Sequence, residues 1–335
     1  MILPGSDSSA LQQAAQALAR GELVGWPTET VYGLGADADN PVAVARVYAA
    51  KGRPSDHPLI VHVTDADRVD HFAVDVPPVA RRLMAAHWPG PLTLILRRRQ
   101  AVADAAAGGQ GSIGLRCPDH PVGQALLRAA QALGVHGVAA PSANRFGRVS
   151  PTTAQHVQDE LGESLLILDG GACPIGIESA IVDCTRGYPV LLRPGMLTAD
   201  VLSQSAGERV LSPQDYAALQ TATPAPKASG TLEAHYAPLA RVRLMKQQDL
   251  QQRLFHLAQD PKRHVSAVWA RSRLTAPDGV LLHAMPTDAQ TCAHELFSQL
   301  RAFDALGIQE LWVEMPPPQA EWDGVRDRLK RAAAA

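Results

Sequence analysis

Cations, hydroxyls and glycines gather in several short stretches of this chain, a combination that suits a phosphate-bearing ligand. Residues 51–62 begin Lys51-Gly-Arg-Pro-Ser-Asp-His57, so Lys51 and Arg53 occupy a Gly/Pro loop between a predicted helix and a predicted buried strand. Arginine offers a planar fork and lysine a point charge, and together they can bind a polyphosphate. A solvated basic turn is the alternative. His62, in the following strand, is either a core residue or a ligand.

A second stretch combines hydroxyls with glycines. Residues 26–35 read Trp-Pro-Thr-Glu-Thr-Val-Tyr-Gly-Leu-Gly. The hydroxyls of Thr28, Thr30 and Tyr32 could bind a ligand, while Gly33 and Gly35 would let the backbone approach it. A strand that runs into an ordinary turn explains the same residues about equally well.

Two predicted apolar strands end in an arginine: Arg116 is the last residue of 113–116, and Arg193 is the last residue of 190–193. An unpaired guanidinium would be costly there, so each needs an anionic partner. For Arg116 this partner could be Asp119 or the carboxylate of a substrate.

Small polar groups follow another predicted strand, 137–140. Ser142, Asn144 and Ser150 lie in the loop after it, a frequent position for ligands in open α/β sheets. The glycine-rich stretch 169–179 adds the hydroxyl of Ser179. The sequence contains no P-loop, no G-x-S-x-G and no H-E-x-x-H motif. Without an evident nucleophile, we expect binding and positioning of phosphates rather than covalent catalysis.

The composition excludes several classes of protein. The chain has 335 residues with 31 basic and 33 acidic side chains, so it lacks the basic character of a nucleic-acid coat. It has no apolar run of membrane-spanning length and no secretory signal at its N-terminus. The 4 cysteines are far apart, which predicts buried free thiols in a reducing cytoplasm. His283, Cys292, His294 and Glu295 are close in sequence, but Cys292 and His294 would face different sides of one helix, so we expect no metal site.

The periodicity predicts an α/β domain over residues 1–206 with a large mixed sheet, a linker over 207–238 and a small α/β domain over 239–335. The expected strands are 23–26, 59–63, 92–96, 113–116, 137–140, 165–168, 180–183, 190–193, 242–245, 265–269, 280–284 and 310–313. The expected helices are 9–20, 42–50, 78–87, 122–133, 153–161, a short one from 198, 250–259, 289–306 and 321–333.

These stretches together resemble the YrdC-like family of threonylcarbamoyl-adenylate synthases, in its long two-domain form. The matching segments, in family order, are Pro27-Thr-Glu-Thr-Val-Tyr-Gly-Leu-Gly35, Lys51-Gly-Arg-Pro, Pro58-Leu-Ile-Val-His62, Pro89-Gly-Pro-Leu-Thr93, Gly114-Leu-Arg-Cys-Pro118, Ala140-Pro-Ser-Ala-Asn144 and Arg193-Pro-Gly195. His235-Tyr-Ala-Pro238 resembles the linker motif of the family.

The resemblance implies a twisted open mixed sheet with a large basic cavity, and a small Rossmann-like C-terminal domain. It implies a cytoplasmic nucleotidyltransferase that converts L-threonine, bicarbonate and ATP, with Mg²⁺, into threonylcarbamoyl-adenylate and pyrophosphate. Other proteins would then transfer the threonylcarbamoyl group to tRNA, and a direct contact with tRNA is left open.

By position, the resemblance assigns two groups of residues. The ATP site would contain Lys51, Arg53, His57, Ser112, Ser142, Asn144, Ser150, Arg193 and His235, with Lys51 and Arg53 as catalytic residues. The L-threonine site would contain Thr30, His62, Arg116, Ala140 and Ser179. His57 stands where the family more often has Asn, and Lys227-Ala-Ser-Gly230 departs from the family's Ser-Pro-Gly-Met run.

Two alternatives belong to other classes. An RNA-binding module could use the same cations without turning over a nucleotide, although the near-neutral charge and the 15 aromatic residues disfavour it. A carbamoyl-transfer domain is the other, but the chain has neither the length nor the cysteine pairs of such proteins.

Overall fold

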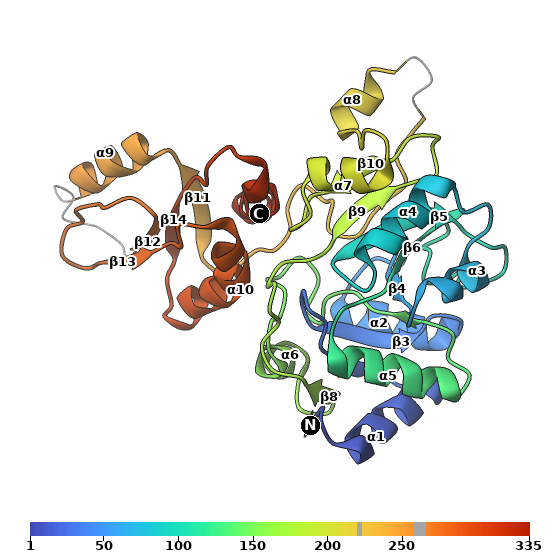
Figure 1. Ribbon diagram of the computed structural model, residues 1–335. Helices are drawn as coiled ribbons and strands as arrows, with labels where there is room; N and C mark the ends of the chain where they lie inside the picture. The colour runs from blue at the N-terminus through green and yellow to red at the C-terminus, as the bar shows by residue number, and fades with distance from the viewer. Residues whose placement is uncertain (220–222, 258–265) are drawn as a thin grey trace. The chain divides into compact units, whose positions relative to one another are not determined.

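The computed structural model describes residues 1–219, 223–257 and 266–335, which form two compact units (Figure 1). Unit 1 consists of Met1–Phe146 and Ser150–Thr231, and unit 2 of Gly147–Val149 and Leu232–Ala335.

Unit 1 is built on a sheet of 10 strands in the order β1-β8-β2-β3-β7-β4-β6-β5-β9-β10. The strands are β1 (Ile2–Pro4), β2 (Val24–Trp26), β3 (Gly33–Asp37), β4 (Ile60–His62), β5 (Leu92–Arg97), β6 (Ser112–Arg116), β7 (Val138–Ala139), β8 (Leu166–Asp169), β9 (Ala180–Asp183) and β10 (Val190–Arg193). The sheet is mixed: β4 and β6 are parallel, for example, whereas β5 and β6 are antiparallel. The expected α/β fold with a large mixed sheet is confirmed.

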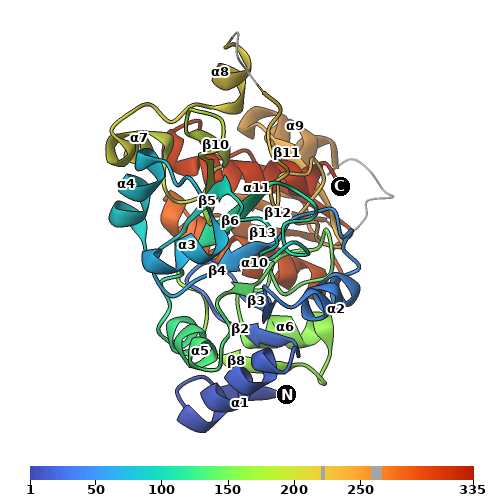
Figure 2. The ribbon, with the colours of Figure 1, turned by 90° about the vertical axis from the view of Figure 1, so that its right-hand side faces the viewer.

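Helices cover both faces of this sheet. They are α1 (Ser8–Ala19), α2 (Pro41–Lys51), α3 (Val69–Phe72, after the 3₁₀ turn Ala66–Arg68), α4 (Pro78–His87), α5 (Pro121–Ala132), α6 (Ala154–Leu161), α7 (Ala199–Ala206) and α8 (Pro213–Ala217). Alternation along the strands separates two apolar layers: Val138 and Leu168 pack with α1 and α5, while Ala139 and Ile167 pack with α2 and α6. Both views show α1 beside α5 and α4 beside α7 (Figures 1 and 2).

Unit 2 contains a fully parallel sheet of 4 strands in the order β11-β14-β12-β13. Its elements are β11 (Arg241–Met245), α9 (Gln247–Leu257), β12 (Ser266–Ala270), β13 (Val280–Ala284), α10 (Ala289–Ala305), β14 (Glu310–Glu314), the 3₁₀ turn Ala320–Trp322 and α11 (Asp323–Ala333). This confirms the predicted α/β pattern of this part, except that residues 258–259 of one predicted helix and residue 265 of one predicted strand lie outside the described residues.

The sequence analysis missed some elements of unit 1. The strands β1 and β3 and the short helices α3 and α8 had not been expected. Helix α8 lies inside the predicted linker, where Ser212 accepts from the N–H of Asp215 and the Tyr216 side chain is buried. Among the described residues, the helices are all too short or too polar to cross a membrane.

Candidate functional site

The loop between β2 and β3 is held in place by its own hydroxyls. Thr28 Oγ1 donates to the carbonyl of Val31 (2.7 Å) and accepts from the Val31 N–H (3.2 Å). The loop backbone is also bound to a distant segment, because the N–H of Ile175 donates to the carbonyl of Glu29 (2.8 Å). These bonds fix Glu29 and Thr30 beside the end of β6.

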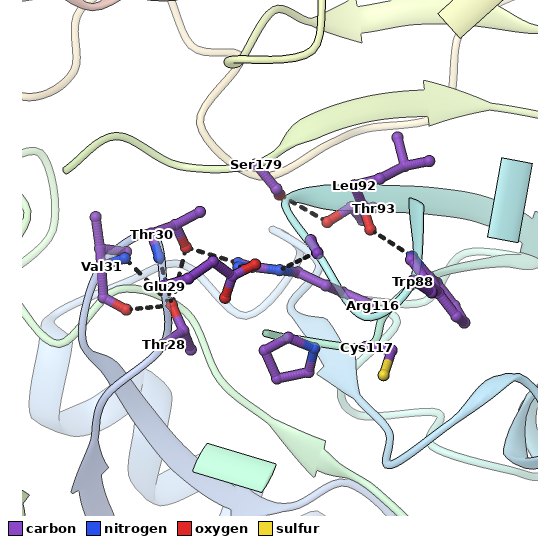
Figure 3. Close-up of polar contacts among 12 residues, drawn as sticks. Thr28, Glu29, Thr30, Val31, Trp88, Leu92, Thr93, Arg116, Cys117 and Ser179 are labelled. Carbon is purple, nitrogen blue, oxygen red and sulfur yellow. Dashed lines mark hydrogen bonds and ion pairs between the residues drawn. The ribbon is translucent and has the colours of Figure 1, made fainter. Parts of the chain in front are cut away.

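Arg116, the last residue of β6, is the centre of this region (Figure 3). Its Nη1 donates to Thr30 Oγ1 (2.8 Å) and its Nε to the carbonyl of Gly90 (3.4 Å). Its Nη2 lies 2.6 Å from Glu29 Oε1, and both side chains are only 5% exposed. The sequence analysis had offered Asp119 or a substrate carboxylate as the anion for Arg116, and the structure adds Glu29 as an anionic partner. The two residues are 87 positions apart, so no local sequence pattern could pair them.

A second set of hydroxyls lies next to Arg116. Thr93 is the cross-strand neighbour of Arg116, and its hydroxyl is 2.8 Å from that of Ser179. Arg193 in turn donates from Nε and Nη2 to the carbonyl of Ser179 (3.1 and 2.9 Å). Gly195 permits this arrangement, since a Cβ there would stand 3.0 Å from the carbonyl carbon of Ser179. The structure thus brings Thr30, Arg116 and Ser179 together, as the predicted threonine site requires.

His62 and Ala140 lie on strands adjoining this network. His62 is paired in register with Arg116 across β4 and β6, and its ring packs edge-on against Trp26 at 5.2 Å. Burial, together with the charge of Arg116, lowers the pKa of His62 to about 3, so its imidazole is neutral near pH 7. The N–H of Ala140 donates to the carbonyl of Ile60 (2.9 Å), which fixes the backbone there.

The predicted phosphate-binding lysine lies at the end of α2. Gly52 adopts a left-handed conformation (φ 62°) that ends the helix. The Lys51 ammonium is buried and donates to the carbonyls of Ser142 (2.6 Å) and Asn144. Burial, and after it the charge of Arg53, lowers the pKa of Lys51 well below its usual range. Lys51, Ser142 and Asn144 therefore form one cluster, as their assignment to a common site requires.

Arg53 and His57 occupy the loop that follows. The guanidinium of Arg53 donates to the carbonyl of Pro58 (2.9 Å) and stands 5.8 Å from the centre of the Phe146 ring. His57 packs edge-on against the same ring at 5.6 Å. Burial, followed by the charge of Arg53, lowers the pKa of His57. His57 is thus placed beside Arg53, on the aromatic side chain that the two share.

A small hollow of about 20 Å³ lies against residues of β4, β5, β6 and β9. It is lined by Pro58, Leu59, Ile60, Thr93, Ile95, Gln110, Ser112, Gly114, Ile181 and the segment Lys227, Ala228 and Ser229. Lys227 Nζ is 2.6 Å from Asp56, and Arg193 donates to the carbonyl of Ser229 (2.9 Å). Part of the predicted linker, residues 227–229, therefore lines this hollow together with Ser112.

The remaining predicted ATP residues are Ser150 and His235. Ser150 is fully buried, and its hydroxyl donates to Glu178 Oε1 at 2.5 Å. His235 belongs to unit 2, where its N–H donates to the carbonyl of Arg331 (3.2 Å) and its ring packs against Tyr236 at 4.2 Å. The structure assigns His235 to a different unit from the other predicted site residues.

Three residues of the hydroxyl- and glycine-rich stretch have structural roles. Gly33 and Gly35 are strand residues, and a Cβ on Gly35 would stand 2.8 Å from Trp26 Nε1. Both glycines make room for this indole, which is a structural reason for glycine at these two positions. The Tyr32 hydroxyl donates to the carbonyl of Gly171 (2.8 Å) and holds two loops together.

Glu29 and Thr93 had been given no role by the sequence analysis, yet both belong to the network around Arg116. Their place follows from strand order, because β5 and β6 are neighbours and the loop after β2 reaches the end of β6. Both residues lie inside the segments that match the family, and this was the only sequence signal for them.

The part of the chain that the structure describes has no group of three or more His, Cys, Asp or Glu side chains that could hold a metal ion. The cysteines Cys117, Cys173, Cys184 and Cys292 are buried free thiols, as expected.

Two family models together match nearly the whole chain. The model described as "Telomere recombination" matches residues 16–195, and the model of the "Threonylcarbamoyl-AMP synthase, C-terminal domain" matches residues 198–334. The chain is 36% identical to the threonylcarbamoyl-AMP synthase of Bacillus subtilis, over 96% of this chain and 92% of that protein. It is 34% identical to the synthase of Pyrococcus abyssi, over 96% of this chain and 93% of that protein.

A solved structure shows the same fold throughout. Sua5 of P. abyssi in complex with L-threonine superposes with a TM-score of 0.84 at 32% identity, covering 96% of this chain and 94% of that one. The family predicted from the motifs is thereby confirmed. This chain belongs to the YrdC-like threonylcarbamoyl-AMP synthase family, in its long two-domain form.

Proposed function

We propose that this enzyme is a nucleotidyltransferase that forms L-threonylcarbamoyl-adenylate and pyrophosphate from L-threonine, bicarbonate and ATP. The observation that carries the proposal is the placing of two hydrogen-bonded pairs, Arg116 with Thr30 and Thr93 with Ser179, on neighbouring strands. Thr93 also lines the hollow that Ser112 lines. We infer that the amino acid would bind beside this hollow, which Ser112 and Lys227 also line. The names of the relatives point to the same product.

In the amino-acid half, Arg116 would bind the threonine carboxylate, because a guanidinium fork matches a planar anion. Thr30 already accepts a hydrogen bond from this guanidinium (2.8 Å) and holds it in place. Neutral His62 would present an uncharged ring to the substrate, since burial lowers its pKa. Ser179 and the backbone at Ala140 would complete the subsite.

In the nucleotide half, Lys51, Arg53 and Arg193 would contact the triphosphate. Lys51 donates to backbone carbonyls of the loop that carries Ser142 and Asn144, so its ammonium lies beside that loop. A phosphate bound there would be in reach of Lys51. Each such cation stabilises charge that develops on phosphate oxygens in the transition state, and loss of one contact costs about 3–4 kcal/mol by analogy with oxyanion donors.

The reaction needs no nucleophile from the protein. The threonine amine would react with bicarbonate to give an N-carboxylate, which attacks the α-phosphorus of ATP in line while pyrophosphate leaves. Mg²⁺ would enter as the counter-ion of the ATP phosphates, and no step of this proposal depends on it. The adenylate would be consumed by proteins that modify tRNA.

The test is mass spectrometry of the products from ATP, ¹³C-bicarbonate and L-threonine, with L-serine as the control amino acid. We expect a labelled threonylcarbamoyl-adenylate together with pyrophosphate. Arg53→Ala should abolish its formation while the circular dichroism spectrum stays unchanged. Equal release of pyrophosphate without threonine or bicarbonate would overturn the assignment.

A further inference from the structure

Glu29 is a buried carboxylate whose oxygens are incompletely satisfied. The residue is 4% exposed, and its side chain faces the guanidinium of Arg116 (Figure 3). Although the two groups are 2.6 Å apart, neither oxygen of Glu29 accepts a well-aligned hydrogen bond among the described residues. Burying a carboxylate in this way is costly, and a group of this kind calls for an explanation.

The protein does not need Glu29 to hold the loop. The backbone carbonyl of Glu29 is bound by the N–H of Ile175, and the hydroxyl of Thr28 closes the turn, so the side chain is not part of these supports. Nor is Glu29 the only group that fixes Arg116, since Thr30 and the carbonyl of Gly90 accept from Nη1 and Nε. The carboxylate therefore has free acceptor capacity at the point where Arg116 would bind a substrate.

The Arg116–Glu29 pair is complementary to the two charges of an α-amino acid. Such a substrate carries a carboxylate and an ammonium on the same carbon, and this pair offers a cation and an anion in direct contact. Binding would replace one buried ion pair by two, with the substrate carboxylate on Arg116 and its ammonium on Glu29. This satisfies the oxygens of Glu29 and leaves no buried charge unpaired.

We propose that Glu29 binds the α-ammonium of threonine and accepts its proton. The inference rests on the proposed function, in which the amine must attack bicarbonate, and an ammonium cannot do so because its lone pair is occupied. One N–H bond of the ammonium breaks and an O–H bond forms on Glu29. The amine nitrogen then bonds to the carbon of bicarbonate, whose hydroxide leaves as water with a second proton of the nitrogen. Glu29 later releases its proton to solvent, so that one proton is liberated for each N-carboxylate formed.

The other titratable groups around Glu29 are less suited to this role. His120 lies close enough for the charge of Glu29 to oppose the lowering of its pKa by burial. However, its Nδ1 accepts from the N–H of Gly123 at the start of α5. Burial, and then the charge of Glu29, raises the pKa of the Cys173 thiol, which leaves it protonated. Among the described residues, Glu29 is the carboxylate that is ion-paired with Arg116.

The test compares two ligands by isothermal titration in the absence of ATP. L-Threonine carries the ammonium, while 3-hydroxybutanoate has a hydrogen in its place. For the full-length chain we expect clear preference for threonine. Glu29→Gln should weaken threonine binding about 10- to 100-fold, the range of a lost charge-assisted contact. The same variant should bind 3-hydroxybutanoate as well as the parent or better, because Arg116 is no longer neutralised.

Asp183→Asn is the matched control. Asp183 is likewise a fully buried carboxylate of unit 1 with an arginine partner, Arg186 at 2.5 Å, but it lies at the far end of β9 from Ser179. This variant should leave the preference for threonine unchanged. Equal weakening of both ligands by Glu29→Gln, or no weakening of threonine, would overturn the proposal.

A second measurement separates this inference from the proposed function. With saturating threonine, bicarbonate and ATP, Glu29→Gln should lower kcat for adenylate formation by about 100-fold or more, as expected for loss of a proton acceptor. Glu29→Asp should restore part of the rate. If the parent chain makes no adenylate while Glu29→Gln still loses its preference for threonine, the ammonium contact stands and the proposed function fails. If the parent makes adenylate and Glu29→Gln keeps the preference, the inference about Glu29 fails alone.

Discussion

The ion pair between Arg116 and Glu29 should be strongly coupled in the folded state. Both side chains are only 5% exposed, so solvent screens their attraction little. At a charge separation of about 4 Å and an effective dielectric constant of about 20, the attraction is about 4 kcal/mol. Removing one partner also leaves the other charge buried and unpaired, and such changes typically cost about 3–5 kcal/mol of stability.

We therefore expect Arg116→Met to lower the free energy of unfolding by about 3–5 kcal/mol. The double variant Arg116→Met with Glu29→Gln should be much more stable than the sum of the two single changes predicts. Urea denaturation of the four proteins gives the coupling energy as a double-mutant cycle. The exposed pair Arg97–Asp75, with both side chains 70% exposed, is the control, and Arg97→Met should cost about 1 kcal/mol or less. A coupling energy below about 0.5 kcal/mol for Arg116 and Glu29 would refute the reasoning.

Three further outcomes follow from features of unit 1 and from the cysteines. Burial lowers the pKa of His62 in the folded chain to about 3, below its unfolded value of about 6.5. Between these two pH values the unfolded chain binds more protons than the folded chain. The free energy of unfolding therefore falls as the pH drops below about 6.5. We expect the free energy of unfolding to fall between pH 7 and pH 4.5 by about 2–3 kcal/mol less in His62→Gln than in the parent, as measured by urea unfolding. An equal fall in both proteins would contradict the lowered pKa of His62. Gly195→Ala would place a Cβ 2.5 Å from the nitrogen of Ala180, whereas Gly111→Ala meets nothing within 4 Å; thermal unfolding should therefore show a loss of about 1–3 kcal/mol for the first and almost none for the second. The 4 cysteines are buried free thiols, and burial raises the pKa of each. A disulfide reagent at pH 8 should label them only after urea is added, and rapid labelling of the native chain would count against this.

Much of the fold could be predicted from local patterns. The predicted ranges of α4, β9 and β10 coincide with those in the structure, because apolar periodicity and flanking turn residues mark them clearly. Strand β3 was missed because Gly33 and Gly35 are typical of turns. Their presence in a strand becomes understandable only once Trp26 is known to pack across them.

The site was predictable as a set of residues but not as a set of contacts. The motifs named Thr30, Arg116 and Ser179. In the structure Thr30 and Glu29 contact Arg116, and Ser179 contacts Thr93, the cross-strand neighbour of Arg116. These contacts are formed between strands and loops distant in sequence, so they depend on the order of the strands in the sheet. Spacing along the chain carries no record of that order.

Strand β6 fixes the distance between the two halves of the proposed site. Ser112, at its first residue, lines the hollow, and Arg116, at its last, carries the ion pair with Glu29. Four residues of extended chain span about 13 Å, and an even number places both side chains on the same face. The distance between the two groups is thus set by backbone geometry and cannot be altered by rearranging a loop. Inserting one residue in this strand would turn one of the two side chains to the opposite face and separate the halves of the site.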